Sequence, residues 1–442
     1  MTAFDSTETA AGAAVTSDQL AQYTRNFNHE PKNRLALNAV SRGRIPEVIL
    51  NRDISQRVNH QFSEKLEVEG KATNQKSSGR CWLFAGLNVM RLHTMSKHKI
   101  DDMELSQGYL FFYDKIEKAN WFLENMIELA DRDLEDRTVQ FLLKDPVQDG
   151  GQWDMFVSLV EKYGVVPKDV YPETLQTSNT AQFAGEIRSL SQEGKSCAEI
   201  RKAKVHMLDE VYRVMCIACG EPPKRFSWSF RDKDKKFHEF SDLTPHSFYK
   251  EHVAYNVTET VSLIHDPRNP YYKLYTVAYL GNIKGGHPIR YINLPVEEIK
   301  ALGVKTIQSG KPIWFGCDVG KHFARQIGVL ELNALDWDLG FGVQFNQDKA
   351  DRLRYGESSM THAMMFTGVH LDAAGKPVRW RVENSWGEDS GSKGFLSMSD
   401  SWFSEFTYQI VLEKSDVPEK ILKVLEEAPV VLPPWDPMGS LA

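Results

Sequence analysis

Cysteine is scarce in this chain, and long apolar runs are missing from it. Its 442 residues include five cysteines, an odd number, and no apolar stretch long enough to cross a membrane. Residues 1–18 are small, polar and acidic, without the basic and apolar character of a secretory leader. A chain of this length buries a core without disulfide staples. These features exclude a small disulfide-stapled secreted protein and favour a reducing cytosol.

Basic residues do not predominate either. The chain has 53 lysines and arginines against 60 acidic residues, which gives a formal net charge of −7. Attraction to phosphate backbones requires concentrated Lys and Arg, so the composition argues against a nucleic-acid partner. The basic stretch at residues 231–236 is interrupted by two aspartates. This pattern is typical of a solvated turn between strands.

Two of the five cysteines, Cys216 and Cys219, form a C-x-x-C pattern that can bind metal or carry redox chemistry. The sequence has no second cysteine pair of this kind. Apolar residues recur every three or four positions from Val205 to Ala218, as on a core-facing helix. We therefore interpret both cysteines as structural thiols.

Cys81 is the most informative cysteine. Gln75 precedes it by six residues, Gly79 lies between them, and an apolar helical pattern begins at the cysteine. Unpaired N–H groups at a helix N-terminus and a nearby imidazolium stabilise a thiolate, and they lower the cysteine pKa from about 8.5. An isolated free cysteine is usually a small buried hydrophobe. The surroundings of Cys81 instead predict a nucleophile.

A thiolate hydrolase also needs an imidazole and a polar group that orients it. Two strands are predicted on either side of a turn, at residues 361–370 and 378–384. Pairing about this turn sets His362 opposite Asn384. His370 lies beside the turn, roughly 25 Å from the first histidine at about 3.3 Å per residue. His362, oriented by Asn384, is therefore the predicted partner of the thiolate.

Two further side chains complete the predicted site. Trp386 follows Asn384 by two positions and is expected to cover the Asn–His hydrogen bond from water, which strengthens that bond. The side-chain amide of Gln75, together with the backbone N–H of Cys81, is expected to stabilise an oxyanion. Without the neighbouring cysteine, Gln75 would be read as a solvated loop residue.

These runs resemble papain-type cysteine peptidases: residues 75–84 around Cys81, Thr-His-Ala at 361–363 and Glu-Asn-Ser-Trp-Gly at 383–387. Three more segments narrow the resemblance to the cytosolic bleomycin hydrolase and aminopeptidase C branch: residues 271–276, 311–320 and 436–442. The resemblance therefore covers nearly the whole chain. No cysteine stands two or three residues before Cys81, so the disulfide typical of secreted relatives is not expected.

The resemblance implies an α+β, papain-like two-lobed fold with a large, mostly helical insertion and a C-terminal arm. The expected parts are an N-terminal arm (1–60), a helical lobe with the nucleophile (61–185), an insertion or oligomerisation region (186–295), a β-rich lobe with the histidine and asparagine (296–413) and the C-terminal arm (414–442). It also implies a cytoplasmic homohexamer whose active sites face an interior cavity.

Two further segments are expected to bind substrate. Gly150 and Gly151 precede a predicted helix at residues 155–163, and paired glycines commonly mark only a turn. In papain-like enzymes the matching segment offers its backbone to the substrate. Residues 428–442 are too apolar for a solvated tail. In the bleomycin hydrolase branch the tail enters the active site, so the carboxylate of Ala442 is expected to hold the substrate's α-amino group.

The resemblance implies a cysteine aminopeptidase that shortens peptides with a free N-terminus. Broad side-chain tolerance is implied, with bleomycin or homocysteine thiolactone as further substrates. No metal, organic cofactor or membrane partner is expected. Three alternatives stay open: a papain-like endopeptidase with an unconstrained cleft, an acyltransferase that uses the same Cys–His pair, and a binding protein in which the triad is incidental.

Overall fold

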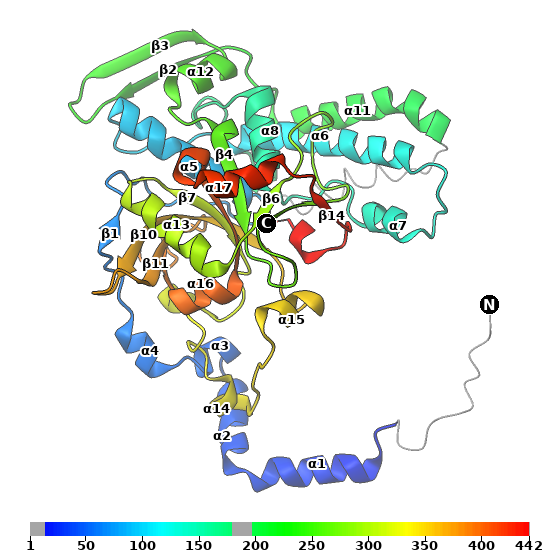
Figure 1. The fold of residues 1–442 in the computed structure, drawn as a ribbon, viewed down its shortest axis with the longest axis vertical. Helices are drawn as coiled ribbons and strands as arrows, with labels where there is room; N and C mark the ends of the chain where they lie inside the picture. Colours follow the sequence, from blue (N-terminus) through cyan, green and yellow to red (C-terminus); the bar gives the residue numbers. More distant parts are fainter. Residues whose placement is uncertain (1–13, 179–196, 442) are drawn as a thin grey trace. The chain divides into compact units, whose positions relative to one another are not determined.

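The computed structural model describes residues 14–178 and 197–441, and it divides into two compact units (Figure 1). The first unit is residues 1–57 with 333–346, and the second is residues 58–332 with 347–442. No helix in the described part of the chain is long and apolar enough to span a membrane.

The first unit is helical. Its helices are α1 (Ser17–His29), α2 (Pro31–Val40), α3 (Ile45–Val48), α4 (Arg52–Arg57) and α14 (Trp337–Phe341). Helix α1 begins where the side chains of Thr16 and Gln19 each bond the other's backbone N–H, a capping box. The Asn51 side chain donates to the Asp336 carboxylate at 2.9 Å, which joins the two segments of the unit. The predicted boundary of an N-terminal arm at residue 60 stays a prediction.

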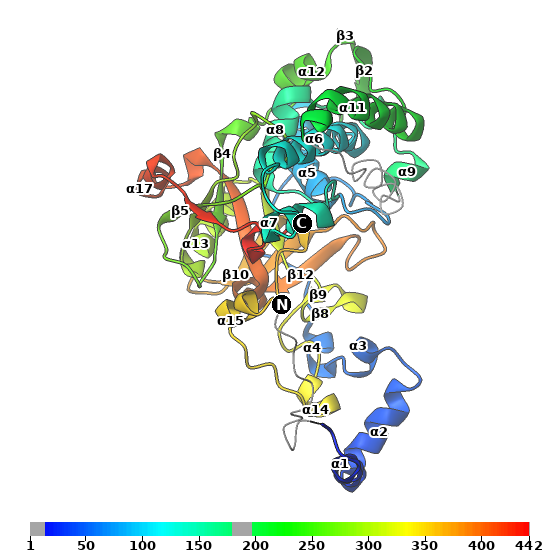
Figure 2. The same cartoon turned by 90° about the vertical axis from the view of Figure 1, so that its right-hand side faces the viewer.

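The second unit contains the remaining helices. These are α5 (Cys81–His98), α6 (Gln107–Glu128), α7 (Arg137–Lys144), α8 (Trp153–Tyr163), α9 (Leu175–Ser178), α11 (Cys197–Cys219), α12 (Pro245–His252), α13 (Val296–Gln308), α15 (Lys349–Arg354), α16 (Asp400–Phe406) and α17 (Glu419–Leu422). Short 3-10 helices span Val257–Glu259, Arg325–Ile327, Lys414–Asp416, Lys423–Glu426 and Pro437–Gly439. Figure 2 shows α5, α6, α8 and α11 gathered on one side of the sheet.

The strands of this unit form one large sheet and one separate hairpin. The large sheet contains β1 (Glu64–Lys65), β4 (Thr260–Ile264), β5 (Lys273–Val277), β6 (Tyr291–Asn293), β7 (Ile313–Cys317), β8 (Phe323–Ala324), β9 (Val329–Leu330), β10 (His362–Leu371), β11 (Pro377–Glu383), β12 (Phe395–Ser399), β13 (Thr407–Glu413) and β14 (Val430–Leu432). Their order is β14-β5-β6-β4-β13-β7-β10-β11-β12-β9-β8, and β1 pairs with β10. The hairpin is β2 (Phe226–Arg231) with β3 (Phe237–Leu243).

This arrangement bears on several sequence expectations. Together, the helices and the large sheet give the expected α+β class. The turn expected at residues 231–236 joins β2 to β3 and is confirmed. Residues 186–295 are not only helical, because they supply β4, β5 and β6 to the large sheet. Residues 260–264 are rich in β-branched and aliphatic side chains, which fit a strand.

Two core clusters pack against opposite faces of the large sheet, because side chains alternate along a strand. Trp314 and Met365 face the cluster that contains α5, α6 and α8, whereas Phe315 and Phe366 face the cluster that contains α13 and α16. Helix α5 packs directly on β7 and β10. Almost every residue in its first four turns is buried, which fits a helix that is apolar on all sides.

The two strands predicted around His362 are confirmed as β10 and β11, but their predicted register is wrong. Leu371 pairs with Pro377, and the partners of β10 lie two or three residues later in the chain than a pairing of His362 with Asn384 would place them. The Asp372 side chain fixes this turn by accepting the backbone N–H groups of Ala374 and Lys376. His362 pairs along the backbone with β7 rather than with β11.

A buried ion pair ties α5 to the end of β11. Arg91 donates to Glu383 Oε1 at 2.7 Å, and the Asn88 side chain donates to the same oxygen at 3.0 Å. Both charged side chains are at most 1% exposed. Burial raises the pKa of Glu383 to about 6, although the Arg91 charge opposes this. Because Glu383 precedes Asn384, the pair fixes the orienting asparagine relative to the helix that begins at Cys81.

Replacing Arg91 by Met should lower the free energy of unfolding at pH 7 by about 3–5 kcal/mol, because Glu383 is left buried without its cation. The double variant Arg91→Met/Glu383→Gln should recover a large part of this loss. Chemical denaturation of the three proteins measures both effects. Equal losses in the single and double variants would show that the charge pairing contributes little.

Candidate active site

The thiol of Cys81 stands at the first residue of α5, as predicted. The side chain is 3% exposed, and backbone N–H groups of Ala363, Trp82 and Cys81 itself favour its anion. Burial nevertheless dominates and raises the pKa of Cys81 to about 11. The predicted lowering of this pKa is therefore not seen for the thiol by itself, because removal from water outweighs the helix N-terminus.

His362 and Asn384 meet through their side chains even though they are not backbone partners. His362 Nε2 donates to Asn384 Oδ1 at 2.9 Å, and Asn384 Oδ1 also accepts the backbone N–H of Ser385. This bond places the proton of the neutral ring on Nε2 and leaves Nδ1 as the basic nitrogen. Burial lowers the pKa of His362 to about 4, while the bond to Asn384 opposes that shift.

Strand β10 places His362 next to a residue that contacts the thiol. Ala363, whose N–H faces the sulfur, directly follows His362 in the strand that packs on α5. Trp386 lies against the imidazole, with ring centroids 5.0 Å apart, as expected for a residue that shields the Asn–His bond. The structure thus brings Cys81, His362, Asn384 and Trp386 together in one place.

Gln75 is a buried residue rather than a solvated loop residue, with 6% exposure. Its Oε1 accepts the Ser385 hydroxyl at 2.6 Å, and its Nε2 donates to the Ser78 carbonyl at 2.5 Å. Its backbone N–H donates to the Ser385 carbonyl. These bonds hold the side-chain amide between the loop before Cys81 and the residue after Asn384. A second N–H on Nε2 suits it to an oxyanion.

The Gly150–Gly151 segment packs on the first turn of α5. A Cβ added to Gly151 would lie 2.5 Å from the ring of Trp82, so only glycine permits this approach. The Trp82 indole donates to the Asp149 carbonyl at 2.8 Å. Lys118 of α6 donates to the Gly150 carbonyl at 2.7 Å. Sequence reasoning missed this lysine, and the available signal was a cluster of charges within an otherwise apolar helix.

The tail is described as far as Leu441, and the predicted substrate contact Ala442 lies outside the described residues. Ser440 contacts both sides of the site. Its carbonyl accepts the Gln152 side chain at 2.5 Å, and its hydroxyl donates to the Met360 carbonyl at 2.8 Å. Gln152 directly follows Gly151, and Met360 precedes His362 by two residues. The tail therefore lies beside the predicted catalytic residues.

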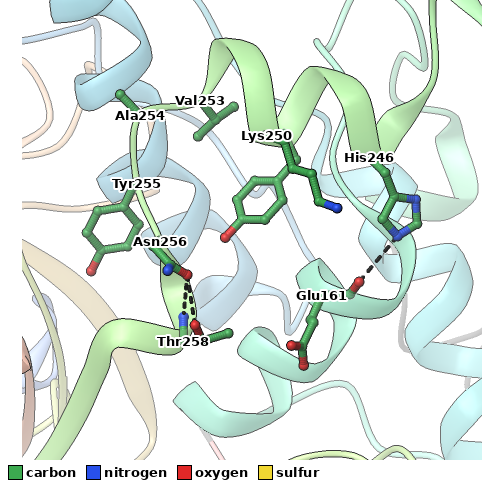
Figure 3. Close-up of a pocket in the computed structure, with 9 residues that line it drawn as sticks. Glu161, His246, Lys250, Val253, Ala254, Tyr255, Asn256 and Thr258 are labelled. Carbon is green, nitrogen blue, oxygen red and sulfur yellow. Dashed lines mark hydrogen bonds between the residues drawn. The ribbon is translucent and has the colours of Figure 1, made fainter.

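A cavity of about 600 Å³ lies away from this site, between the end of α8 and α12 (Figure 3). His246 is hydrogen bonded to the Glu161 carbonyl there, and Tyr249 and Tyr255 line the same cavity. It contains none of the predicted site residues. Among the residues of known placement, no group of three or more His, Cys, Asp or Glu side chains is arranged to hold a metal. Cys216 and Cys219 of α11 pack at the core as free thiols.

Comparison with known proteins gives matches over nearly the full chain. Bleomycin hydrolase of Rattus norvegicus is 46% identical, over 97% of this chain and 99% of that protein. Aminopeptidase C of Lactobacillus helveticus is 42% identical, over 97% of this chain and 98% of that protein. The crystal structure of PepW from Lactobacillus rhamnosis superposes with a TM-score of 0.92 at 43% identity and covers 97% of this chain and 100% of that chain.

These findings confirm the resemblance to the bleomycin hydrolase and aminopeptidase C branch, the papain-like α+β fold class and the assignment to cysteine-type aminopeptidases. A model of the Peptidase C1-like family matches residues 14–439, a range that includes both lobes and all but the last three residues of the tail. The chain belongs to the Peptidase C1-like family.

Proposed function

We propose that this enzyme removes residues one at a time from the free N-terminus of short peptides, with Cys81 as nucleophile. The observation that carries this proposal is the hydrogen bond from His362 to Asn384. His362 lies on β10, and the next residue of that strand, Ala363, presents its backbone N–H to the Cys81 thiol. Thiol, imidazole and orienting amide are the three groups that nucleophilic hydrolysis by cysteine requires.

In this mechanism the Cys81 sulfur attacks the carbonyl carbon of the first residue while His362 Nδ1 takes the thiol proton. The Cys81 N–H and the Gln75 side-chain amide hold the oxyanion. The C–N bond then breaks, and the departing amine takes the proton from His362. Water attacks the remaining thioester and gives a proton to the same nitrogen, and the acid leaves as the thiol forms again.

The opposing pKa shifts of Cys81 and His362 have one cause, the burial of both groups. Each charge by itself is disfavoured in this setting, since desolvation penalises thiolate and imidazolium alike. Transfer of a proton from sulfur to imidazole creates both charges at once, and each then stabilises the other. We infer that this proton transfer accompanies the attack of the sulfur on the substrate, with Trp386 and Asn384 holding the ring in place.

We propose that the tail makes the enzyme an aminopeptidase. The bonds of Ser440 to Gln152 and Met360 support this proposal, because they hold the tail beside Gly151 and His362. There the carboxylate of Ala442 would bind the substrate's α-amino group by a charge-assisted hydrogen bond worth about 1.5–3 kcal/mol. The tail would also obstruct peptide upstream of the first residue. Bleomycin and homocysteine thiolactone are proposed further substrates, because each presents a carbonyl next to a free amino group.

We further propose that the enzyme acts in the cytoplasm as a homohexamer. Support comes from the first compact unit, where α1 and α2 carry large exposed apolar side chains. These are Leu20, Tyr23, Phe27, Leu35 and Leu37, each at least 45% exposed. Clustered apolar side chains of this size are typical of a surface that is covered in an assembly.

Replacing Cys81 by Ala should lower the hydrolysis of a fluorogenic aminoacyl amide by a factor on the order of 10⁴ or more, because the covalent route is lost. Cys216→Ala is the matched control, since that thiol lies on α11 away from the site, and it should leave the rate unchanged. Kinetics of the purified variants measure both. Hydrolysis that survives the loss of the Cys81 sulfur would disprove the proposed chemistry.

Deletion of Leu441 and Ala442 should lower the preference for a free over an N-acetylated peptide by roughly 10- to 100-fold, the equivalent of one charge-assisted bond. The same fluorogenic peptide in its two forms, assayed with the full chain and the deletion variant, gives this ratio. An unchanged ratio would mean that another group selects the N-terminus. Equal cleavage of both forms by the full chain would identify an endopeptidase.

Acid should destabilise the enzyme through His362. Because burial lowers its pKa from 6.5 to about 4, the unfolded chain binds the proton more tightly, and stability present above pH 6.5 is lost as the pH falls toward 4. The loss amounts to about 3 kcal/mol by pH 4. Denaturation of the native protein and His362→Gln at several pH values should show curves that converge in acid. Parallel curves would contradict this assignment.

A further inference from the structure

We propose that Lys118 is a positioning residue for substrate binding, acting with Asp114 and Lys115 to fix the orientation of the Gly150–Gly151 peptide. This inference rests on the proposed function and adds a part to it. These side chains lie on α6, outside the segments that carry the proposed catalytic groups.

The three charged side chains lie inside the protein. Asp114 and Lys115 are 0% exposed and Lys118 is 3% exposed. Burial of charge costs several kcal/mol per ion unless the groups are paired and hydrogen bonded. A helix that retains three such groups on its buried side therefore needs acceptors in the facing segment, and residues 147–150 provide them.

The ammonium group of Lys118 lies within 2.9 Å of three oxygen atoms. It donates to the Gly150 carbonyl at 2.7 Å and to the Gln148 carbonyl at 2.9 Å, and it pairs with Asp114 Oδ2 at 2.7 Å. Asp114 Oδ1 in turn accepts the Asn282 side chain at 3.0 Å. The ammonium thus sets the direction of two backbone carbonyls in the loop.

Lys115 holds the alternate residues of the same loop. It donates to the Val147 carbonyl at 3.1 Å and forms an ion pair with Asp149. On its other side the loop packs against the segment that leads into α5. A Cβ added to Gly79 in that segment would lie 2.6 Å from Asp149. The loop is therefore held between two helices, by lysines from α6 and by close packing on the residues that precede Cys81.

The consequence for substrate follows from the planarity of the peptide bond. In a trans peptide the C=O of one residue and the N–H of the next point in opposite directions. Since Lys118 draws the Gly150 carbonyl toward α6, the N–H of Gly151 must point away from α6. The resemblance to papain-like enzymes implies that this segment offers its backbone to the substrate, and the Lys118 bond would then fix the direction of the Gly151 N–H before the peptide binds.

The test compares Lys118→Met with the double variant Asp114→Asn/Lys118→Met. The single variant leaves Asp114 buried without its closest cation and should be less stable, with KM for a dipeptide amide raised roughly tenfold. The double variant removes the buried charge and should recover stability, yet KM should stay raised because the Gly150 carbonyl is still not held. The value of kcat should change less than KM in both.

Alkylation of Cys81 by iodoacetamide, followed by the mass of the Cys81 peptide, is the second readout. This reagent has no peptide to align, so its rate should stay within about twofold of the native rate. Lys300→Met is the matched control, since it breaks another buried lysine pair, to Asp400 at 2.7 Å, away from the site. It should lower stability and leave KM unchanged.

Recovery of both stability and KM in the double variant would overturn the inference, because the role of Lys118 would then be structural. An unchanged KM in folded Lys118→Met would overturn it too. Failure of the proposed function is separate from these results, since it would appear as peptide hydrolysis that persists after full alkylation of Cys81 in the native protein.

Discussion

The packing of helix α5 on strands β7 and β10 is the contact on which the rest of the site depends. The helix begins at the proposed nucleophile Cys81, and the strand β10 begins at the proposed base His362. Because α5 is buried nearly all round, its position is fixed by core contacts on several sides rather than by one interface. Core packing therefore holds the start of α5 and the start of β10 next to each other, with the Ala363 N–H on the Cys81 thiol.

Buried charge pairs, rather than disulfides, fix the segments around this contact. Arg80, directly before Cys81, donates to both carboxylate oxygens of Glu173 at 3.0 and 2.7 Å. A second pair ties α5 to the end of β11, and Lys118 with Asp114 holds the glycine loop. Burial of each pair costs desolvation free energy. Because a charge that loses its partner in the interior is strongly unfavourable, each pair also keeps the two segments that it joins in fixed relative positions. Such pairs can fix the segments of the site in a chain whose described cysteines are free thiols and form no disulfides.

Much of this site could be predicted from residue patterns. The start of α5 at Cys81, the two strands around the turn and the partnership of His362 with Asn384 all follow from local periodicity and from the chemistry of the side chains. The register of β10 on β11 could not be predicted, because the centre of the turn depends on a side-chain bond made by Asp372. Two register shifts between β10 and β11 add to the difference between the predicted and the observed pairing.

Local patterns were enough to predict most of the elements around the site and the groups proposed to carry the chemistry, because helical and strand periods and reactive side chains are local properties. The electrostatics of the site, in contrast, follow from tertiary packing. The raised pKa of Cys81, the lowered pKa of His362 and the lysines beneath Gly150 arise from burial by segments far apart in the chain. The path of Ser440 between Gln152 and Met360 has the same origin, since no local pattern specifies where a tail binds.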